Sequence, residues 1–208
     1  MIHRHPMKVF VFVLLILAGL LPLASCGGAK QPSGQKNPVV TITMDTGKTI
    51  KVELYPDKAP NTVNNFIYVI RQGFLDGTIF HRVSPSFMIQ GGEMARDLGY
   101  TISGEFSGNG FTGNDIKHER GVISMARSND MNSATTQFFL MTGDAPGLDD
   151  LYAAFGRVTE GMDVVDEIAN QEWGAPYGDG TGKPAADQVM ASVTVDTFGV
   201  SYPEPTKR

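Results

Sequence analysis

Short segments in which apolar and polar residues alternate, separated by turn residues, recur along this 208-residue chain. Val40, Ile42 and Met44 alternate with polar residues, and after the turn residues 45–48 the alternation resumes as far as Leu54. A period of two places the apolar side chains on one face of a strand, so this pattern predicts a β-hairpin. Six further strands are predicted at residues 79–83, 87–90, 121–126, 136–141, 153–158 and 189–198.

Two segments show helical spacing instead. Val63, Phe66 and Ile70 lie three and four residues apart, and Gly73 is placed to end a helix. A second, shorter helix is predicted over residues 161–170. The pattern therefore predicts an all-β domain with two helices. Pattern alone leaves open whether the strands form a sandwich or a closed barrel.

The N-terminal segment has the features of a signal peptide. A basic start is followed by the uncharged apolar run 9–21, which is too short to span a bilayer comfortably. The run ends in Leu-Ala-Ser before Cys26, which resembles the lipobox of bacterial lipoproteins, where the cysteine is lipidated after cleavage. An ordinary secretory signal with an incidental cysteine is the alternative. We expect residues 1–25 to be a lipoprotein signal peptide and the protein to be extracytoplasmic, lipid-anchored to a bacterial membrane through Cys26.

The remaining chain divides into a tether, one domain and a tail. Residues 26–38 lack apolar periodicity and are rich in Gly, Gln, Lys and Pro, so a flexible tether is predicted to follow the lipidated cysteine. The domain is expected to cover residues 39–199, and residues 200–208 are expected to fray as a C-terminal tail. Residues 93–118 and 171–188 are predicted as long loops.

Composition excludes several classes of function. With 17 Lys and Arg against 22 Asp and Glu, the net charge of −5 argues against nucleic-acid binding. The single cysteine cannot form an intrachain disulfide. His81 and His118 lie too far apart in sequence for a helical metal-ligand spacing, and neither a G-x-S-x-G nor a Walker motif is present. We therefore expect no metal and no cofactor.

Three ordered motifs carry the strongest functional signal. They are FHRVSPSFMIQGG at residues 80–92, KHERGVISMARSNDMNSATTQFF at 117–139 and LDDLYAAFGRVTEGMDVV at 148–165. Together they resemble the cyclophilin-type peptidyl-prolyl cis-trans isomerases, and the likeness runs from Val39 to Phe198. The resemblance implies a closed eight-stranded antiparallel β-barrel capped by two α-helices. The barrel interior would be filled with side chains, and the substrate groove would lie on the outer face.

The resemblance also implies roles for individual residues. Arg82 is implied to be the catalytic arginine. The proline pocket would be lined by Phe87, Met88, Phe139 and Leu148, and polar contacts would come from Gln90 and Gln137. The backbone at Ala126 and Arg127 would pair with the extended substrate, and the side chains of His81 and Tyr152 would lie at the rim.

These residue types suit rotation about an X–Pro bond. The barrier of about 18–20 kcal/mol arises from partial double-bond character, so no nucleophile or metal is needed. A guanidinium that donates to the proline nitrogen stabilises the twisted amide more than the planar one. Lowering the barrier by about 6–7 kcal/mol gives roughly 10⁴–10⁵-fold acceleration. Such catalysis would help exported or surface proteins to fold, because X–Pro isomerisation is slow enough to limit folding.

Two alternatives remain open at this stage. A non-catalytic module, a chaperone or an adhesin, would use the same groove to hold proline-containing segments. The presence of Arg82 argues against it, because binding alone needs only the apolar pocket. A lipoprotein that binds a small molecule in a barrel cavity would require an interior not filled by side chains.

The chain departs from the family pattern at several positions. Gly147 stands where many cyclophilins carry a tryptophan that helps to bind cyclosporin, so weak cyclosporin binding is expected. Tyr152 replaces a frequent histidine, and Arg127 replaces a frequent asparagine. The expected partners are proline-containing polypeptides and, through the lipid anchor only, a membrane; a monomer is expected.

Overall fold

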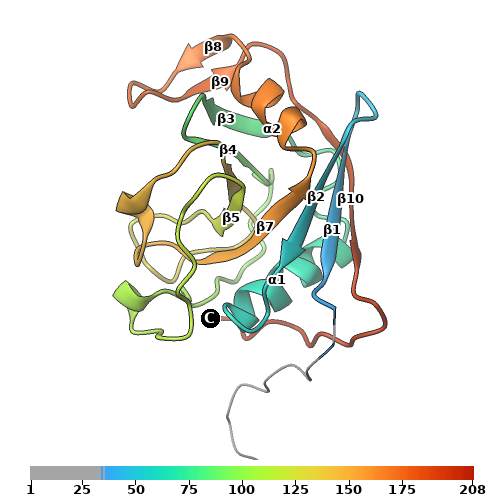
Figure 1. Cartoon of the computed structure of the whole chain (residues 1–208), viewed down its shortest axis with the longest axis vertical. Helices are drawn as coiled ribbons and strands as arrows, with labels where there is room; N and C mark the ends of the chain where they lie inside the picture. The colour runs from blue at the N-terminus through green and yellow to red at the C-terminus, as the bar shows by residue number, and fades with distance from the viewer. Residues whose placement is uncertain (1–33, 35) are drawn as a thin grey trace, which may run out of the picture.

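The computed structural model describes residue 34 and residues 36–208. The predicted signal peptide, Cys26 and most of the predicted tether lie outside the described residues. The described part contains one antiparallel sheet and two α-helices (Figure 1). Its strands are β1 (Val39–Met44), β2 (Thr49–Leu54), β3 (Phe80–Ser84), β4 (Met88–Gly91), β5 (Val122–Met125), β6 (Phe138–Met141), β7 (Ala154–Glu160), β8 (Trp173–Pro176), β9 (Gly182–Pro184) and β10 (Met190–Asp196).

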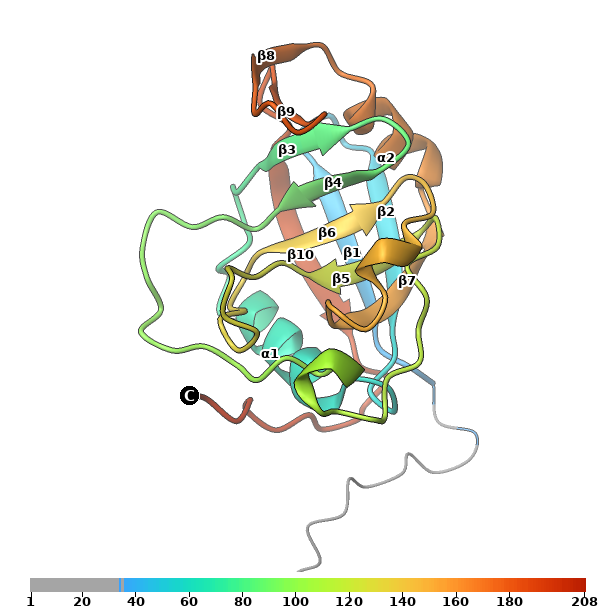
Figure 2. The same ribbon diagram turned by 90° about the vertical axis from the view of Figure 1, so that its left-hand side faces the viewer.

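The helices α1 (Pro60–Arg71) and α2 (Met162–Ala169) lie at opposite ends of the molecule in both ribbon views (Figures 1 and 2). Single 3₁₀ turns occur at Ser107–Asn109 and Pro146–Leu148. Both predicted helices and all eight predicted strands are present, with ends that shift by a residue or two. None of the helices in the described residues has the length and apolar character needed to cross a membrane.

The prediction of a closed eight-stranded barrel is wrong. Ten strands form an open sheet in the order β10-β1-β2-β7-β5-β6-β4-β3-β9-β8. The outer edge of β3 is occupied by β9, which pairs with it at Val83 and Gly182. Between β3 and β10 there remains one isolated bridge, from Ile79 to Val189, in place of a ladder. The hairpin β8–β9 therefore adds two strands at the place where closure was expected (Figure 2).

The main core lies between α1 and the inner face of the sheet. Phe66 of α1 is fully buried and meets Phe138 and Phe155 edge-on, with ring centroids 5.2 and 5.1 Å apart. Phe80 adds a further edge contact to Phe138 at 5.9 Å. These large rings fill the interior, as the family resemblance implies.

The N-terminus of α1 is capped from a distant segment. Ala59 at the N-cap makes no side-chain hydrogen bond. The carboxylate of Glu105 instead accepts from the backbone N–H groups of Asn61 and Thr62, at 3.0 and 2.7 Å, and also from the Thr62 hydroxyl. The first turn of a helix leaves such N–H groups without an intrahelical partner. Glu105 therefore fixes the long connection between β4 and β5 to the end of the helix.

The last residues differ from the fraying tail predicted from the sequence. Thr101 and Arg208 exchange two backbone hydrogen bonds, and Asn61 pairs with the backbone of Thr206 through both ends of its amide. The Lys207 ammonium lies over an aromatic ring of α1, that of Tyr68, at 4.6 Å. These contacts hold the tail against the helix, where Figure 1 shows the C-terminus.

Candidate active site

A pocket of about 160 Å³ lies over β3, β4 and β6. It joins side chains from all three sequence motifs, including most of those predicted to bind substrate. Its lining residues are Arg82, Phe87, Met88, Gln90, Ala126, Arg127, Phe139, Leu148 and Tyr152. The structure thus brings together nine of the eleven residues predicted for the site from the sequence.

Strand alternation places the apolar wall of the pocket on the face opposite the main core. Phe138 and Leu140 of β6 belong to the main core, whereas Phe139 between them belongs to a separate cluster with Met88. Successive side chains of a strand point to opposite faces, which accounts for this division. Gln90 pairs with Phe139 across the β4–β6 ladder, so the polar and apolar sides of the pocket are adjacent.

Arg82 and Gln90 form the polar side of the pocket, and a second glutamine supports them from outside it. Its Nη1 donates to Gln90 Oε1 at 3.0 Å, and Gln90 Nε2 donates to Gln137 Oε1 at 2.8 Å. Gln137 does not line the pocket but orients the amide that contacts Arg82. The Arg82 side chain is 30% exposed, so the guanidinium reaches the pocket without being fully buried.

Ala126 and Arg127, predicted to pair with the substrate through their backbone, also make contacts within the protein. The Ala126 N–H donates to the Gln137 carbonyl at 2.9 Å, so it is engaged within the protein. The Arg127 guanidinium donates to the Leu151 carbonyl from Nε and Nη2, at 3.1 and 2.9 Å, and lies 4.6 Å from the ring centroid of Tyr152. Arg127 therefore holds the segment that carries Tyr152 against the pocket, in addition to any backbone contact.

His81 does not line the pocket. It precedes Arg82 on β3, at an irregularity where the register with β4 shifts between Phe80 and Arg82. Burial lowers the pKa of the His81 ring, which favours its neutral form. The rim contact predicted for His81 has no counterpart among the residues that surround the pocket.

A buried polar network lies behind the apolar wall and was not assigned to the site from the sequence. His118 Nδ1 lies 3.1 Å from Asp149 Oδ1, and its Nε2 lies 3.0 Å from Ser124 Oγ. These contacts assign the proton to Nδ1, with the Ser124 hydroxyl donating to Nε2. The His118 ring also stacks on Phe139, with centroids 6.1 Å apart and planes inclined by 20°.

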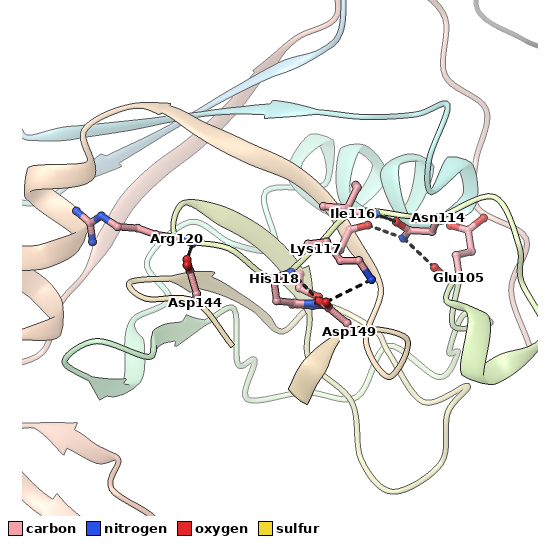
Figure 3. Close-up of polar contacts among 10 residues, drawn as sticks. Glu105, Asn114, Ile116, Lys117, His118, Arg120, Asp144 and Asp149 are labelled. Atoms are coloured by element: carbon pink, nitrogen blue, oxygen red, sulfur yellow. Dashed lines mark hydrogen bonds and ion pairs between the residues drawn. The ribbon is translucent and has the colours of Figure 1, made fainter. Parts of the chain in front are cut away.

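Asp149 connects this network to a second wall of the pocket. It directly follows Leu148, and its Oδ1 also accepts the backbone N–H of His118 at 2.8 Å. Figure 3 shows His118 and Lys117 both directed at this carboxylate. Ser124 is fully buried, so the Ser–His–Asp arrangement presents no nucleophile to the pocket. It supports Phe139 and Leu148 from behind the pocket.

Among the described residues, no group of three or more His, Cys, Asp or Glu side chains could hold a metal ion.

The family model "Cyclophilin type peptidyl-prolyl cis-trans isomerase/CLD" matches residues 39–195. A peptidyl-prolyl cis-trans isomerase of Acinetobacter baylyi is 39% identical over 168 residues, which are 76% of this chain and 81% of the relative. Peptidyl-prolyl cis-trans isomerase B of Escherichia coli is 38% identical over 165 residues, which are 76% of this chain and 99% of the relative.

Solved structures resemble the fold as well. The crystal structure of the cyclophilin AquaCyp293 from Hirschia baltica has a TM-score of 0.61 at 28% identity, covering 75% of this chain and 73% of that one. A cyclophilin-type isomerase of Cryptosporidium parvum, crystallised in the presence of the dipeptide Ala-Pro, has a TM-score of 0.63 at 24% identity. The match covers 76% of this chain and 98% of that one, and shows the fold alone.

We predict that the free energy of unfolding falls as the pH is lowered from about 7.5 to 5.5, and that His118→Gln reduces this fall. Burial, which outweighs the opposing contacts with Asp149, lowers the pKa of His118 below its ordinary value of 6.5. The folded protein therefore keeps a neutral ring where the unfolded chain takes up a proton. This contribution is present above the unfolded pKa and is lost as the pH falls below it. One such group changes stability by at most about 1.4 kcal/mol per pH unit.

Urea unfolding at the two pH values measures this effect. His81→Gln is the comparison, because burial lowers the pKa of that histidine too and it should remove a separate part of the fall. Although burial opposes it, hydrogen bonding from His118 and Lys117 lowers the pKa of Asp149, so that carboxylate loses its contribution only at more acidic pH. An unchanged pH dependence in His118→Gln would show that the ring titrates alike in both states.

Proposed function

This chain belongs to the cyclophilin-type peptidyl-prolyl cis-trans isomerase family, and we propose that it accelerates X–Pro rotation in exported or surface proteins through Arg82. The observation that carries the mechanism is a guanidinium beside apolar side chains in a pocket of about 160 Å³. Pockets for drug-sized ligands are larger, at about 300–1,000 Å³, so this one suits a single small ring. Proline-containing polypeptides are the proposed substrates, and the protein is proposed to act as a monomer.

The proposed mechanism needs positioning and charge, without a covalent step. The proline ring would occupy the space beside Phe87, Phe139 and Leu148, where apolar side chains exclude water. As the amide twists, resonance is lost and the proline nitrogen regains its lone pair. An N–H of Arg82 would donate to that nitrogen more strongly in the twisted state than in the planar one, which is differential binding.

Gln90 supports this role by holding one edge of the guanidinium. Its amide oxygen accepts from Nη1, while Gln137 fixes the other end of the amide. Both glutamine amides are neutral, so they orient this edge of the guanidinium without placing a negative charge beside it. A lysine could not replace this arrangement, because an ammonium lacks the planar fork of donors.

The filled interior weighs against the alternative of a lipoprotein that stores a small molecule inside a barrel. Phe66, Phe80, Phe138 and Phe155 are fully buried in the main core. The non-catalytic binding module remains the second candidate, and it would use the same pocket. The two candidates differ in what Arg82 contributes.

We predict that Arg82→Ala lowers kcat/KM by about 100-fold or more, because removing one preorganised donor commonly costs that much. Affinity for a proline-containing peptide, measured by NMR titration, should change much less, since the apolar wall remains. Isomerisation would be followed without a coupling protease, by NMR exchange on the full-length chain.

Arg71→Ala is the matched control, because Arg71 ends α1 and does not line the pocket. It should retain the rate of the unaltered chain. If Arg82→Ala isomerises the peptide as fast as the unaltered chain does, Arg82 is not catalytic. If neither the unaltered chain nor Arg82→Ala accelerates rotation while both bind the peptide, the protein is a non-catalytic binding module.

Cyclosporin should inhibit this protein weakly, and we predict that Gly147→Trp strengthens inhibition by about tenfold or more. Gly147 precedes Leu148 of the pocket, and a Cβ built on it would have no atom within 4 Å. A tryptophan there has room to cover an apolar ligand, and burying its surface is favourable. Inhibition curves for both chains test this expectation. Strong inhibition of the unaltered chain would contradict it, and Gly147→Ala, which adds no ring, is the control.

We propose that the protein is extracytoplasmic and held to a membrane by acyl chains on Cys26, and we predict that Cys26→Ser releases it. The net charge of −5 offers no attraction to anionic lipid, so anchoring would depend on the acyl chains. The unaltered protein should sediment with membranes, and the variant should not. Ser25→Ala, beside the cysteine, is the control. Equal membrane association of Cys26→Ser and the unaltered chain would contradict lipidation.

A further inference from the structure

The second edge of the Arg82 guanidinium is bound by the turn that joins β8 to β9. Arg82 Nε donates to Thr181 Oγ1 at 2.9 Å, and Nη2 donates to Asp179 Oδ2 at 2.7 Å. The Thr181 hydroxyl donates in turn to Asp179 Oδ1, which also accepts the backbone N–H of Thr181. Arg82, Thr181 and Asp179 therefore form a closed ring of hydrogen bonds.

This ring decides which donors of Arg82 stay available. A guanidinium carries five N–H groups in one plane. The Nε group, one Nη1 group and one Nη2 group bind Thr181, Gln90 and Asp179. One N–H on each terminal nitrogen remains for a substrate. With both edges bound, the plane of the guanidinium cannot turn away from the pocket without breaking charge-assisted hydrogen bonds.

The turn itself is fixed to the strand that carries Arg82. Thr181 is only 1% exposed, and the next residue, Gly182, pairs with Val83 of β3. Ser84 Oγ donates to the Gly180 carbonyl at 2.7 Å. Figure 2 shows the β8–β9 hairpin beside β3, at the end of the sheet. These contacts fix the position of the turn on β3, and with it the position of the Asp179 carboxylate.

We infer that Asp179 and Thr181 are positioning residues that hold the Arg82 guanidinium ready for the twisted X–Pro amide, which makes the β8–β9 turn part of the catalytic machinery. The inference rests on the proposed function. A long arginine side chain has many rotamers, and a donor that acts only in the transition state gains from being held beforehand. The Thr181 hydroxyl, and then the nearby Arg82, lowers the pKa of the Asp179 carboxyl, so it is ionised at neutral pH.

The ion pair acts on activity far more than on stability. The side chains of Asp179 and Arg82 are 52% and 30% exposed, and pairs as exposed as this contribute little to folding. Small displacements of a catalytic group, by contrast, have large effects on rate. Loss of the carboxylate should therefore lower kcat while the fold persists.

The test compares Asp179→Asn and Thr181→Val with the unaltered full-length chain. Each variant should lower kcat by about tenfold with little change in KM, and Thr181→Ser, which keeps the hydroxyl, should restore the rate. Asp166→Asn is the matched control. It removes an exposed ion pair on another surface, in which Arg120 Nη2 lies 2.6 Å from Asp166 Oδ2. It should leave kcat unchanged, and all the variants should melt within about 3 °C of the unaltered chain.

A second measurement follows the guanidinium directly. The ¹⁵Nε–H resonance of Arg82, assigned with Arg82→Lys, should be resolved and slow to exchange in the unaltered chain. In Thr181→Val it should broaden or exchange quickly, and in Thr181→Ser it should recover. These expectations do not depend on turnover.

The outcomes separate the two proposals. An active unaltered chain with undiminished kcat in Asp179→Asn and Thr181→Val overturns the inference, as does an unchanged Arg82 resonance in Thr181→Val. An unaltered chain without isomerase activity overturns the proposed function, whatever the resonance shows. Loss of activity together with loss of the Arg82 signal, in variants that stay folded, supports the positioning role.

Discussion

The pairing of β4 with β6 is the constraint on which the site depends, because both faces of this ladder are buried. Ile89 and Leu140 face each other on the side of the main core, while Met88 and Phe139 lie on the pocket side. A slip of one residue would send the core side chains to the pocket and the pocket side chains to the core. Burial on both faces therefore fixes the register, and the register sets Gln90 beside Phe139.

Arg82 takes its place from this ladder and from the hydrogen bonds on its two edges. The neutral amide of Gln90 accepts from Nη1 of the guanidinium, and the ionised carboxylate of Asp179 accepts from Nη2. In the proposed mechanism, a second carboxylate at position 90 would compete with the weakly basic proline nitrogen for the same donors. The division between an amide and a carboxylate keeps the guanidinium ordered and still able to donate.

Local patterns predicted most of the fold. Alternation located eight strands, and helical spacing located α1 and α2, because each pattern reflects burial of one face. The hairpin β8–β9 escaped this reasoning, since Gly174, Pro176, Gly182 and Pro184 dominate two very short strands and mask any alternation. Alternation does not show whether a sheet is open or closed, because closure depends on what occupies the outer edge of β3.

The pocket walls were predicted from the sequence, but the residues that hold them in place were not, because they lie far away along the chain. The pocket walls lie in ordered motifs, so resemblance located them together. Asp179 lies 97 residues from Arg82, and the Asn61–Thr206 pair that holds the tail spans 145 residues. Contacts of that kind leave no periodic signal in a single sequence. The contact of His118 with Asp149 could not be predicted either, because Asp149 is an ordinary acidic residue until the fold brings it near.

Rotation about a peptide bond requires no bond to carbon to break, so in the proposed mechanism the protein contributes binding, orientation and a fixed charge. That requirement explains why polar groups well outside the pocket matter to it. His118 and Asp149 keep Phe139 and Leu148 in place from behind, and the β8–β9 turn keeps Arg82 in place from the side. The two supports share no residue, and each joins segments far apart in sequence. In the proposed mechanism, loosening either one would leave a pocket that still takes a proline ring but presents a misplaced wall or a misplaced donor to the twisted amide.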